Sequence, residues 1–335
     1  MYRVLSRGLV VICLSCKLAL AFGPADDLAE KLRTIAPREW KEYTEWLSDA
    51  CGTVECKEFS ADGILTQKSR TTIRQRNAEL SVEQIFEQGP NVDGVTELFT
   101  LNSDYGFKLS RKDSVPWQFD NLAKANDWDA LGNVGQQIKA ARRFINPTFL
   151  QRESLSEIIL KPYFKLKSIT EVNDERYGKL VRMEFDYPHP YEGSNRSNPF
   201  NWVQRGTVWL DSQHAWVIVR AQVECLNPPD NTIDYSEIVH EFEENSSSKY
   251  HLMTRRIDNT FDESWKRKVN RCVREIELTI PDDPPKASEF RLSHYGFKEP
   301  KVEKAKLPIA MIAGVGFGLA LLIGALLLRR RNAER

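Results

Sequence analysis

The chain has 335 residues with 47 basic and 47 acidic side chains, and residues 22–328 carry a small acidic excess. A protein that binds nucleic acid needs a basic surface, so this balance argues against DNA or RNA as a partner. The mean hydropathy of -0.47 fits a water-soluble body with a single membrane anchor and excludes a multi-span transporter.

The N-terminus has the pattern of an export signal. Arg3 and Arg7 precede a short apolar run, and small residues end at Ala21. This pattern predicts a signal peptide over residues 1–21 that is removed by cleavage. Lys17 interrupts the apolar pattern, and the alternative is an uncleaved signal anchor. Either form carries the following chain across a membrane.

The longest uncharged apolar stretch covers residues 309–328 and is followed by three arginines. At about 1.5 Å per residue, a helix of this length spans about 30 Å, the thickness of a bilayer's hydrocarbon core. Lysines before it nearly balance the arginines after it, so charge alone does not set its orientation. The export signal sets the orientation, and the two features together predict a single-pass type I protein of a bacterial inner membrane. The main domain is then extracytoplasmic, with residues 329–335 in the cytoplasm.

Small residues recur at every fourth position in this apolar stretch. Ala310, Gly314 and Gly318 would share one face of a helix, a pattern typical of paired membrane helices. The pattern favours either a homodimer or simple tolerance of glycine in a single span. The same glycines do not predict a nucleotide loop, because no strand precedes them.

The body is predicted to be an α+β domain. Residues 22–57 have the spacing of short helices, divided at Pro37. Residues 58–285 alternate between apolar and polar side chains in many short runs, which predicts a curved antiparallel sheet packed on helices. Residues 286–308 contain few apolar side chains and are predicted to form an extended, solvated linker to the membrane.

Within the body, two series of strands are separated by helices. The first series lies between residues 71 and 111, and the second lies between residues 164 and 280. Helical spacing over residues 119–144 and 154–160 predicts the helices between the two series. Residues 206–224 give the clearest hairpin, in which the valines of the returning strand share one face.

Cysteine usage indicates an oxidising compartment. Four cysteines remain once the signal is removed: Cys51, Cys56, Cys225 and Cys272. An even number in an exported domain predicts disulfides. We favour Cys51–Cys56 and Cys225–Cys272, and the alternative is a set of free thiols.

The sequence contains no recognisable catalytic, metal-binding or cofactor motif. His240-Glu241 begins like a zinc-protease motif, but position 244 is Glu244 and the surrounding alternation predicts a strand. Trp209 and Trp216 flank the predicted hairpin turn. They form either part of a core or the wall of an apolar cleft.

Residues 60–290 resemble the periplasmic lipoprotein-carrier fold, because an exported chain of that fold also has a run of strands, a central helix and then further strands. The hairpin GTVWLDSQHAWVIVRAQVE resembles its strand-turn-strand unit. The end, EFRLSHYGFKEP before the apolar stretch and the arginines, looks like that of uncharacterised bacterial single-pass membrane proteins carrying such a domain. The resemblance implies a half-barrel that closes over helices around an apolar cavity, and no functional residue is carried over from it.

The sequence therefore predicts a membrane-anchored extracytoplasmic binding domain that performs no catalysis. Its partner would be an apolar ligand, a lipid-modified protein or another protein. A first alternative is a sensor or assembly subunit that acts through paired membrane helices. A second is an exported hydrolase whose catalytic residues are scattered along the chain.

Overall fold

The computed structural model describes residues 24–301, apart from residues 91, 114, 152, 189–201, 228–231, 244–248, 263–264 and 266. The predicted signal peptide, the apolar stretch 309–328 with its pairing residues, and the C-terminal tail lie outside the described residues. Among the described residues, no helix has both the length and the apolar character needed to span a membrane.

A large antiparallel sheet dominates the fold. Its first strands are β1 (Cys51–Ser60), β2 (Leu65–Arg76), β3 (Glu79–Gln88), β4 (Val95–Leu101), β5 (Tyr105–Lys112) and β6 (Gln118–Lys124). Its later strands are β9 (Lys165–Asp174), β10 (Gly178–Asp186), β11 (Trp202–Asp211), β12 (Val217–Asn227), β13 (Thr232–Phe242), β14 (Met253–Phe261) and β15 (Lys268–Thr279). The short strands β7 (Phe149–Leu150) and β8 (Glu153–Ser154) form a separate pair.

The described strands form a 13-stranded sheet in the order β6-β5-β4-β3-β2-β1-β15-β14-β13-β12-β11-β10-β9. Each series is a meander in which neighbours in sequence are neighbours in the sheet. The two meanders meet where β1 pairs with β15. The sheet is not closed, because β6 and β9 are its two ends.

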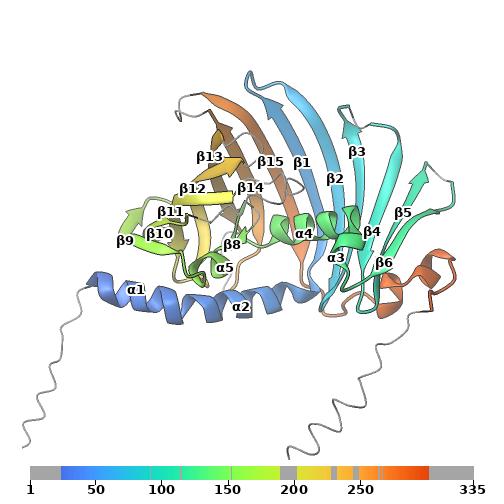
Figure 1. Cartoon of the computed structure of the whole chain (residues 1–335), viewed down its shortest axis with the longest axis horizontal. Helices are drawn as coiled ribbons and strands as arrows, with labels where there is room; N and C mark the ends of the chain where they lie inside the picture. Colours follow the sequence, from blue (N-terminus) through green and yellow to red (C-terminus); the bar gives the residue numbers. More distant parts are fainter. Residues whose placement is uncertain are drawn as a thin grey trace, which may run out of the picture.

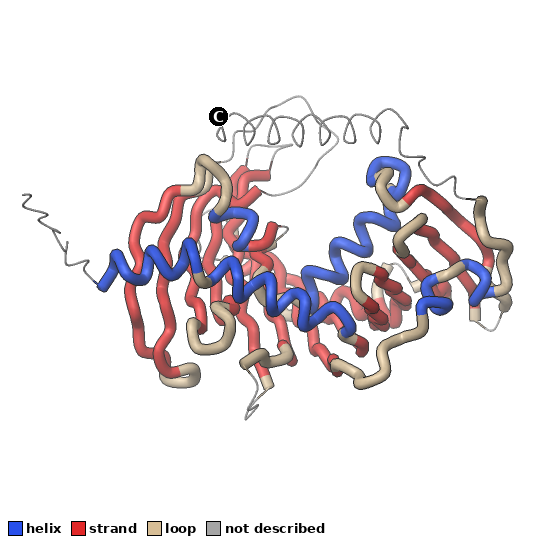
Figure 2. Tube along the Cα trace, turned by 90° about the horizontal axis from the view of Figure 1, so that it is seen from below, coloured by secondary structure: helices blue, strands red, loops and turns tan. Residues whose placement is uncertain are grey.

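The helices lie against the inner face of the curved sheet. They are α1 (Pro24–Thr34), α2 (Ala36–Trp46), α3 (Trp128–Leu131), α4 (Asn133–Ile145) and α5 (Leu155–Ile159). The 3-10 turn η1 (Leu47–Asp49) follows α2, whereas the turns η2 (Ala287–Phe290) and η3 (Leu292–Tyr295) lie on the outer face. Helices α1 and α2 run below the strands in the view of Figure 1, and α4 lies over the half of the sheet that contains β3, β4 and β5 (Figures 1 and 2). Helix α1 contacts β9, whereas α4 contacts β3, β4 and β5.

Most predicted elements are present. The two series of predicted strands correspond to β2–β5 and β9–β15, and Pro37 occupies the first turn of α2. Two strands, β1 and β6, differ from the prediction. Residues 51–57 belong to β1 rather than to the helical segment, and residues 118–124 form β6 rather than a helix. Strand β1 carries polar side chains on its inner face, and β6 is an exposed edge strand, so neither shows clear apolar alternation.

The predicted solvated linker is wrong for its first part. Residues 287–297 pack on the outer face of β4 and β5, where Phe290 is 0% and Leu292 is 2% exposed. Asn102 Nδ2 donates to the Phe290 carbonyl oxygen at 2.8 Å, and Arg291 pairs with Asp104 at 2.7 Å. A few aromatic and aliphatic residues are sufficient to dock a segment whose overall composition is polar.

The core between α2 and the β11–β12 hairpin gives a first test of the fold. Trp40 is 2% exposed, and its Nε1 donates to the Trp216 carbonyl oxygen at 2.8 Å. We expect Trp40→Ala to lower the free energy of unfolding by about 3–5 kcal/mol, because it leaves a cavity and an unpaired carbonyl. Urea denaturation measures this loss. The matched control is Trp128→Ala, whose side chain is 41% exposed and whose loss we expect to be about 1 kcal/mol or less. Equal losses in both variants would contradict this role for Trp40.

Candidate functional site

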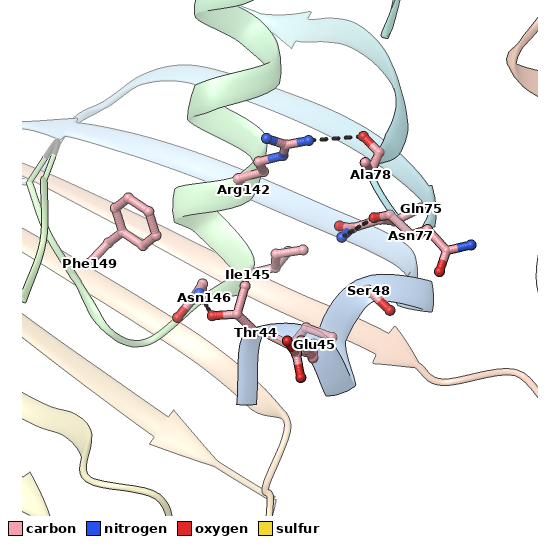
Figure 3. A pocket seen from close by; sticks show the side chains of 11 residues that line it. Thr44, Glu45, Ser48, Gln75, Asn77, Ala78, Arg142, Ile145, Asn146 and Phe149 are labelled. Carbon is pink, nitrogen blue, oxygen red and sulfur yellow. Dashed lines mark hydrogen bonds between the residues drawn. The ribbon is translucent and has the colours of Figure 1, made fainter. Parts of the chain in front are cut away.

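A groove of about 650 Å³ lies between the C-terminal ends of α2 and α4 and the turn that joins β2 to β3 (Figure 3). Its lining comes from three separate parts of the chain: Thr44, Glu45, Leu47, Ser48; Gln75, Asn77, Ala78; and Arg142, Ile145, Asn146, Phe149. This volume falls within the range of about 300–1,000 Å³ that is usual for small-molecule pockets.

The floor of the groove is apolar and belongs to the main core. Leu47 is 3% and Ile145 is 2% exposed, and both join the same buried cluster. Helix α4 ends at Ile145 because the residue before Pro147 is disfavoured in helical geometry. Asn146 then donates from Nδ2 to Thr44 Oγ1 at 3.1 Å, which holds the two helix ends beside each other.

Polar groups lie at the edge of this floor. Arg142 Nη2 donates to the Ala78 carbonyl oxygen at 3.0 Å, and burial lowers the pKa of Arg142. Gln75 is 9% exposed, and its Nε2 donates to the Asn77 carbonyl oxygen at 3.5 Å. Its Oε1 is buried without a hydrogen-bond partner among the described residues. The groove therefore presents an apolar floor and a guanidinium, and the Gln75 Oε1 acceptor is buried beside them.

A row of charged side chains supports the groove from the inner face of the sheet. Arg256 is 3% exposed and donates through Nε and Nη2 to Asp258 at 3.0 and 2.9 Å. Its Nη1 donates to the Arg143 and Phe149 carbonyl oxygens at 3.3 and 3.5 Å. Arg274 also donates to Asp258. The row thereby ties β14 to the end of α4, which forms one wall of the groove.

A second, smaller pocket of about 330 Å³ contains an Asp–His pair. His214 Nδ1 lies 2.7 Å from Asp211 Oδ2, and its ring centroid lies 4.1 Å from that of His251. This arrangement can hold or transfer a proton. The residues that line the pocket include no serine, threonine or cysteine.

The two predicted cleft tryptophans do not line a common cleft. Trp216 is 3% exposed and packs in the core, as the core interpretation predicts. Trp209 lies against two guanidiniums, with Arg220 at 5.1 Å and Arg182 at 5.9 Å from its ring centroid. Neither residue lines the groove, the pocket with the Asp–His pair or two further pockets of about 490 and 380 Å³.

The favoured cysteine pairing is wrong, and all four candidate cysteines are free thiols in the structure. Cys51 and Cys56 lie on the same extended strand, about 16 Å apart at about 3.3 Å per residue. Cys225 lies on β12, and two strands separate it from Cys272 on β15. The structure instead places Cys56 Sγ 3.1 Å from Cys272 Sγ.

The sequence pattern does not predict the groove residues. Gln75 has one detectable signal, since it shares the inner face of β2 with the buried residues Thr71 and Ile73. A glutamine at a buried strand position is uncommon and marks a polar requirement. Arg142 has no such signal, because an arginine in the last turn of a helix is ordinary.

No protein-family model and no curated protein matches this sequence. Among solved structures, the chain is similar to a DUF1329 family protein from Desulfovibrio piger, with a TM-score of 0.39 and 9% sequence identity. The match covers 78% of this chain and 98% of that chain. Similarity at this level carries no information about activity.

Proposed function

We propose that this protein binds an apolar ligand that carries a polar group, such as the acyl chain of a lipid or of a lipid-modified protein, and that it does so without catalysis. The groove between α2 and α4 is the binding site. The observation that carries the proposal is its apolar floor of Leu47 and Ile145 beside the buried Gln75 Oε1, which has no hydrogen-bond partner in the described part of the chain. Such a combination suits a ligand with a hydrocarbon body and a hydrogen-bond donor.

Each part of the groove has a role in this proposal. The apolar floor takes up the hydrocarbon and removes it from water, at about 0.8 kcal/mol for each buried CH₂ group. Gln75 Oε1 accepts a hydrogen bond from a hydroxyl or amide of the ligand. Arg142 supplies guanidinium donors beyond the one used at Ala78, and these suit a carbonyl or a carboxylate.

The sequence pattern supports a location of the groove on the outer side of the membrane. The export signal and the apolar residues 309–328 support an anchored protein whose binding domain lies outside the cytoplasm. A tethered domain does not carry its ligand across a compartment. We therefore propose that it receives or presents the ligand close to the membrane surface.

Filling the groove provides a direct test. Ala78 is an exposed turn residue at the groove's edge, so Ala78→Trp introduces a large side chain without disturbing the core. We expect this variant to lose about tenfold or more in ligand capture, equivalent to about 1.4 kcal/mol of binding free energy. Membranes containing the full chain are incubated with a photoactivatable fatty acid and irradiated, and the labelled peptides are identified by mass spectrometry.

The matched control is Ala61→Trp. Ala61 is an exposed turn residue at the opposite end of β2, away from the groove. We expect labelled peptides from α2 and the end of α4 in the wild type and in this control. Labelling confined to residues 309–328, or labelling that Ala78→Trp leaves unchanged, would refute the proposed binding site.

A further inference from the structure

The junction between the two meanders places two thiols in contact. Cys56 lies on β1 and Cys272 lies on β15, and the two strands pair antiparallel. The two Sγ atoms are 3.1 Å apart, about 1 Å more than a covalent S–S bond of about 2.05 Å. A small adjustment of the two side chains therefore brings them to bonding distance.

The environment of the pair favours thiol chemistry at Cys56. Cys56 is partly exposed, whereas Cys272 is 8% exposed. Hydrogen bonding from the Cys272 thiol, together with the charge of Arg274, lowers the pKa of Cys56 although burial opposes this. Hydrogen bonding to Cys56 and burial both raise the pKa of Cys272. The accessible member of the pair is thus the more acidic one, as an attacking thiol requires.

We propose that Cys56 and Cys272 form a redox-active pair, which closes to an intrachain disulfide across the β1–β15 junction when it meets a small-molecule or protein disulfide. This inference does not depend on what occupies the groove. Every other hydrogen-bonded contact between strands of the sheet lies within one meander. The bond would therefore join covalently the two halves of the sheet that meet only at this pair of strands.

The reaction balances with glutathione disulfide as the oxidant. The Cys56 thiolate attacks one sulfur of glutathione disulfide, which forms a mixed disulfide and releases one glutathione. Cys272 gives its proton to solvent, and its thiolate attacks Cys56 Sγ, which releases the second glutathione. Two thiols are oxidised, and one disulfide is reduced to two thiols.

A metal site is the competing interpretation of the same cluster. Ligand atoms of Cys56, Glu58 and Cys272 all lie within 4.8 Å of one another. Arg274 is the residue directly opposite Cys56 on β15, and its guanidinium adds positive charge to the same region. Asp258 and Glu58 offset part of that charge. The direct Sγ–Sγ contact of 3.1 Å, with the guanidinium beside it, suits disulfide formation better than zinc binding.

The test uses the full chain, purified under reducing conditions and then equilibrated with glutathione disulfide. Free thiols are alkylated, and the protein is cleaved after glutamate. Glu55 lies between Cys51 and Cys56, so this cleavage separates the two cysteines. We expect a cross-linked peptide pair that contains Cys56 and Cys272. It should persist in the control Cys51→Ser, which removes a partly exposed thiol of the same strand, and disappear in Cys56→Ser and Cys272→Ser.

Thermal unfolding provides a second readout. Oxidation should raise the unfolding midpoint by about 5 °C or more in the wild type and in Cys51→Ser, because a cross-link restricts the unfolded chain. It should have no such effect in Cys56→Ser. Alkylation of both Cys56 and Cys272 after oxidation would overturn the proposal. The proposal would also be overturned if the chain bound one zinc ion, if this binding required Cys56, and if it blocked the cross-link.

Discussion

Asp258→Asn is expected to lower the free energy of unfolding by about 3–5 kcal/mol. Asp258 lies between two arginines on the inner face of the sheet. It accepts hydrogen bonds from Arg256 and from Arg274, whose side chains are 4% and 14% exposed. Asparagine keeps the shape of the residue but removes its charge. The two guanidiniums would then lie close together in the interior with no anion to balance them.

The direction of the Asp258 pKa supports this expectation. Burial alone would raise the pKa of this carboxyl group, but Arg256 and Arg274 outweigh burial and hold the pKa below its usual range. The carboxylate is therefore charged in the folded protein at neutral pH. Its stabilising contribution is fully present above the unfolded pKa of about 3.9 and is lost only as the pH falls below that value.

Urea denaturation at pH 7 measures the loss, with Glu171→Gln as the matched control. Glu171 forms an ion pair with Lys179 at 3.7 Å, and its side chain is 57% exposed. An exposed pair of this kind contributes about 1 kcal/mol or less. If Asp258→Asn lost no more stability than Glu171→Gln, the buried row could not be what holds α4 against the sheet.

The strands of this protein could be predicted because most of them are half-buried. Residues of β2 at positions 71 and 73 face the core while their neighbours face solvent. Such alternation predicts a half-buried strand from the sequence alone. Strand β1 is not predicted because its inner face carries Cys56, opposite Arg274, and Glu58, opposite Cys272. A polar inner face removes the signal on which the prediction rests.

The β11–β12 hairpin shows how one inserted residue changes a strand's faces. Trp209 pairs with Arg220 and Leu210 pairs with Ile218, which leaves Val219 without a partner in a bulge. The predicted common face of valines is therefore wrong. Val217 and Val219 pack in one core cluster, whereas Ala221 and Val223 pack in another. A bulge shifts the side-chain alternation by one position, and composition gives no sign of where it occurs.

The groove could not be predicted because its walls are distant in sequence. Thr44, Gln75 and Arg142 come together only because α4 crosses the strands that follow α2. The predicted disulfide pairing is wrong for a related reason. Cys51 and Cys56 are close in sequence, but an extended strand separates them, whereas Cys56 and Cys272 meet through the pairing of the first strand with the last.

His240 should make the protein sensitive to moderate acid. Its side chain is 0% exposed, and its Nδ1 donates to the Ile218 carbonyl oxygen at 2.7 Å. Burial and the charge of Arg256 lower the pKa of His240 to about 3. In the unfolded chain the pKa returns to about 6.5. Between these values the unfolded state binds a proton that the folded state does not, so stability falls as the pH decreases.

The expected slope is about 1.4 kcal/mol of lost stability for each pH unit below about pH 6.5. His240→Gln keeps a neutral donor near the Ile218 carbonyl and cannot titrate. We therefore expect wild type to lose about 2–3 kcal/mol more than His240→Gln between pH 6.5 and about pH 4.5. That interval lies above the range in which Asp258 is protonated, so the two contributions separate.

Urea denaturation across this pH range measures the difference, and the slope rather than the absolute stability is the informative quantity. Any fixed loss caused by the substitution cancels from the slope. His294→Gln is the matched control, because His294 is exposed. Its slope should equal that of the wild type. If His240→Gln and the wild type also had equal slopes, His240 would be protonated in the folded state, and a buried neutral imidazole beside Arg256 could not be maintained.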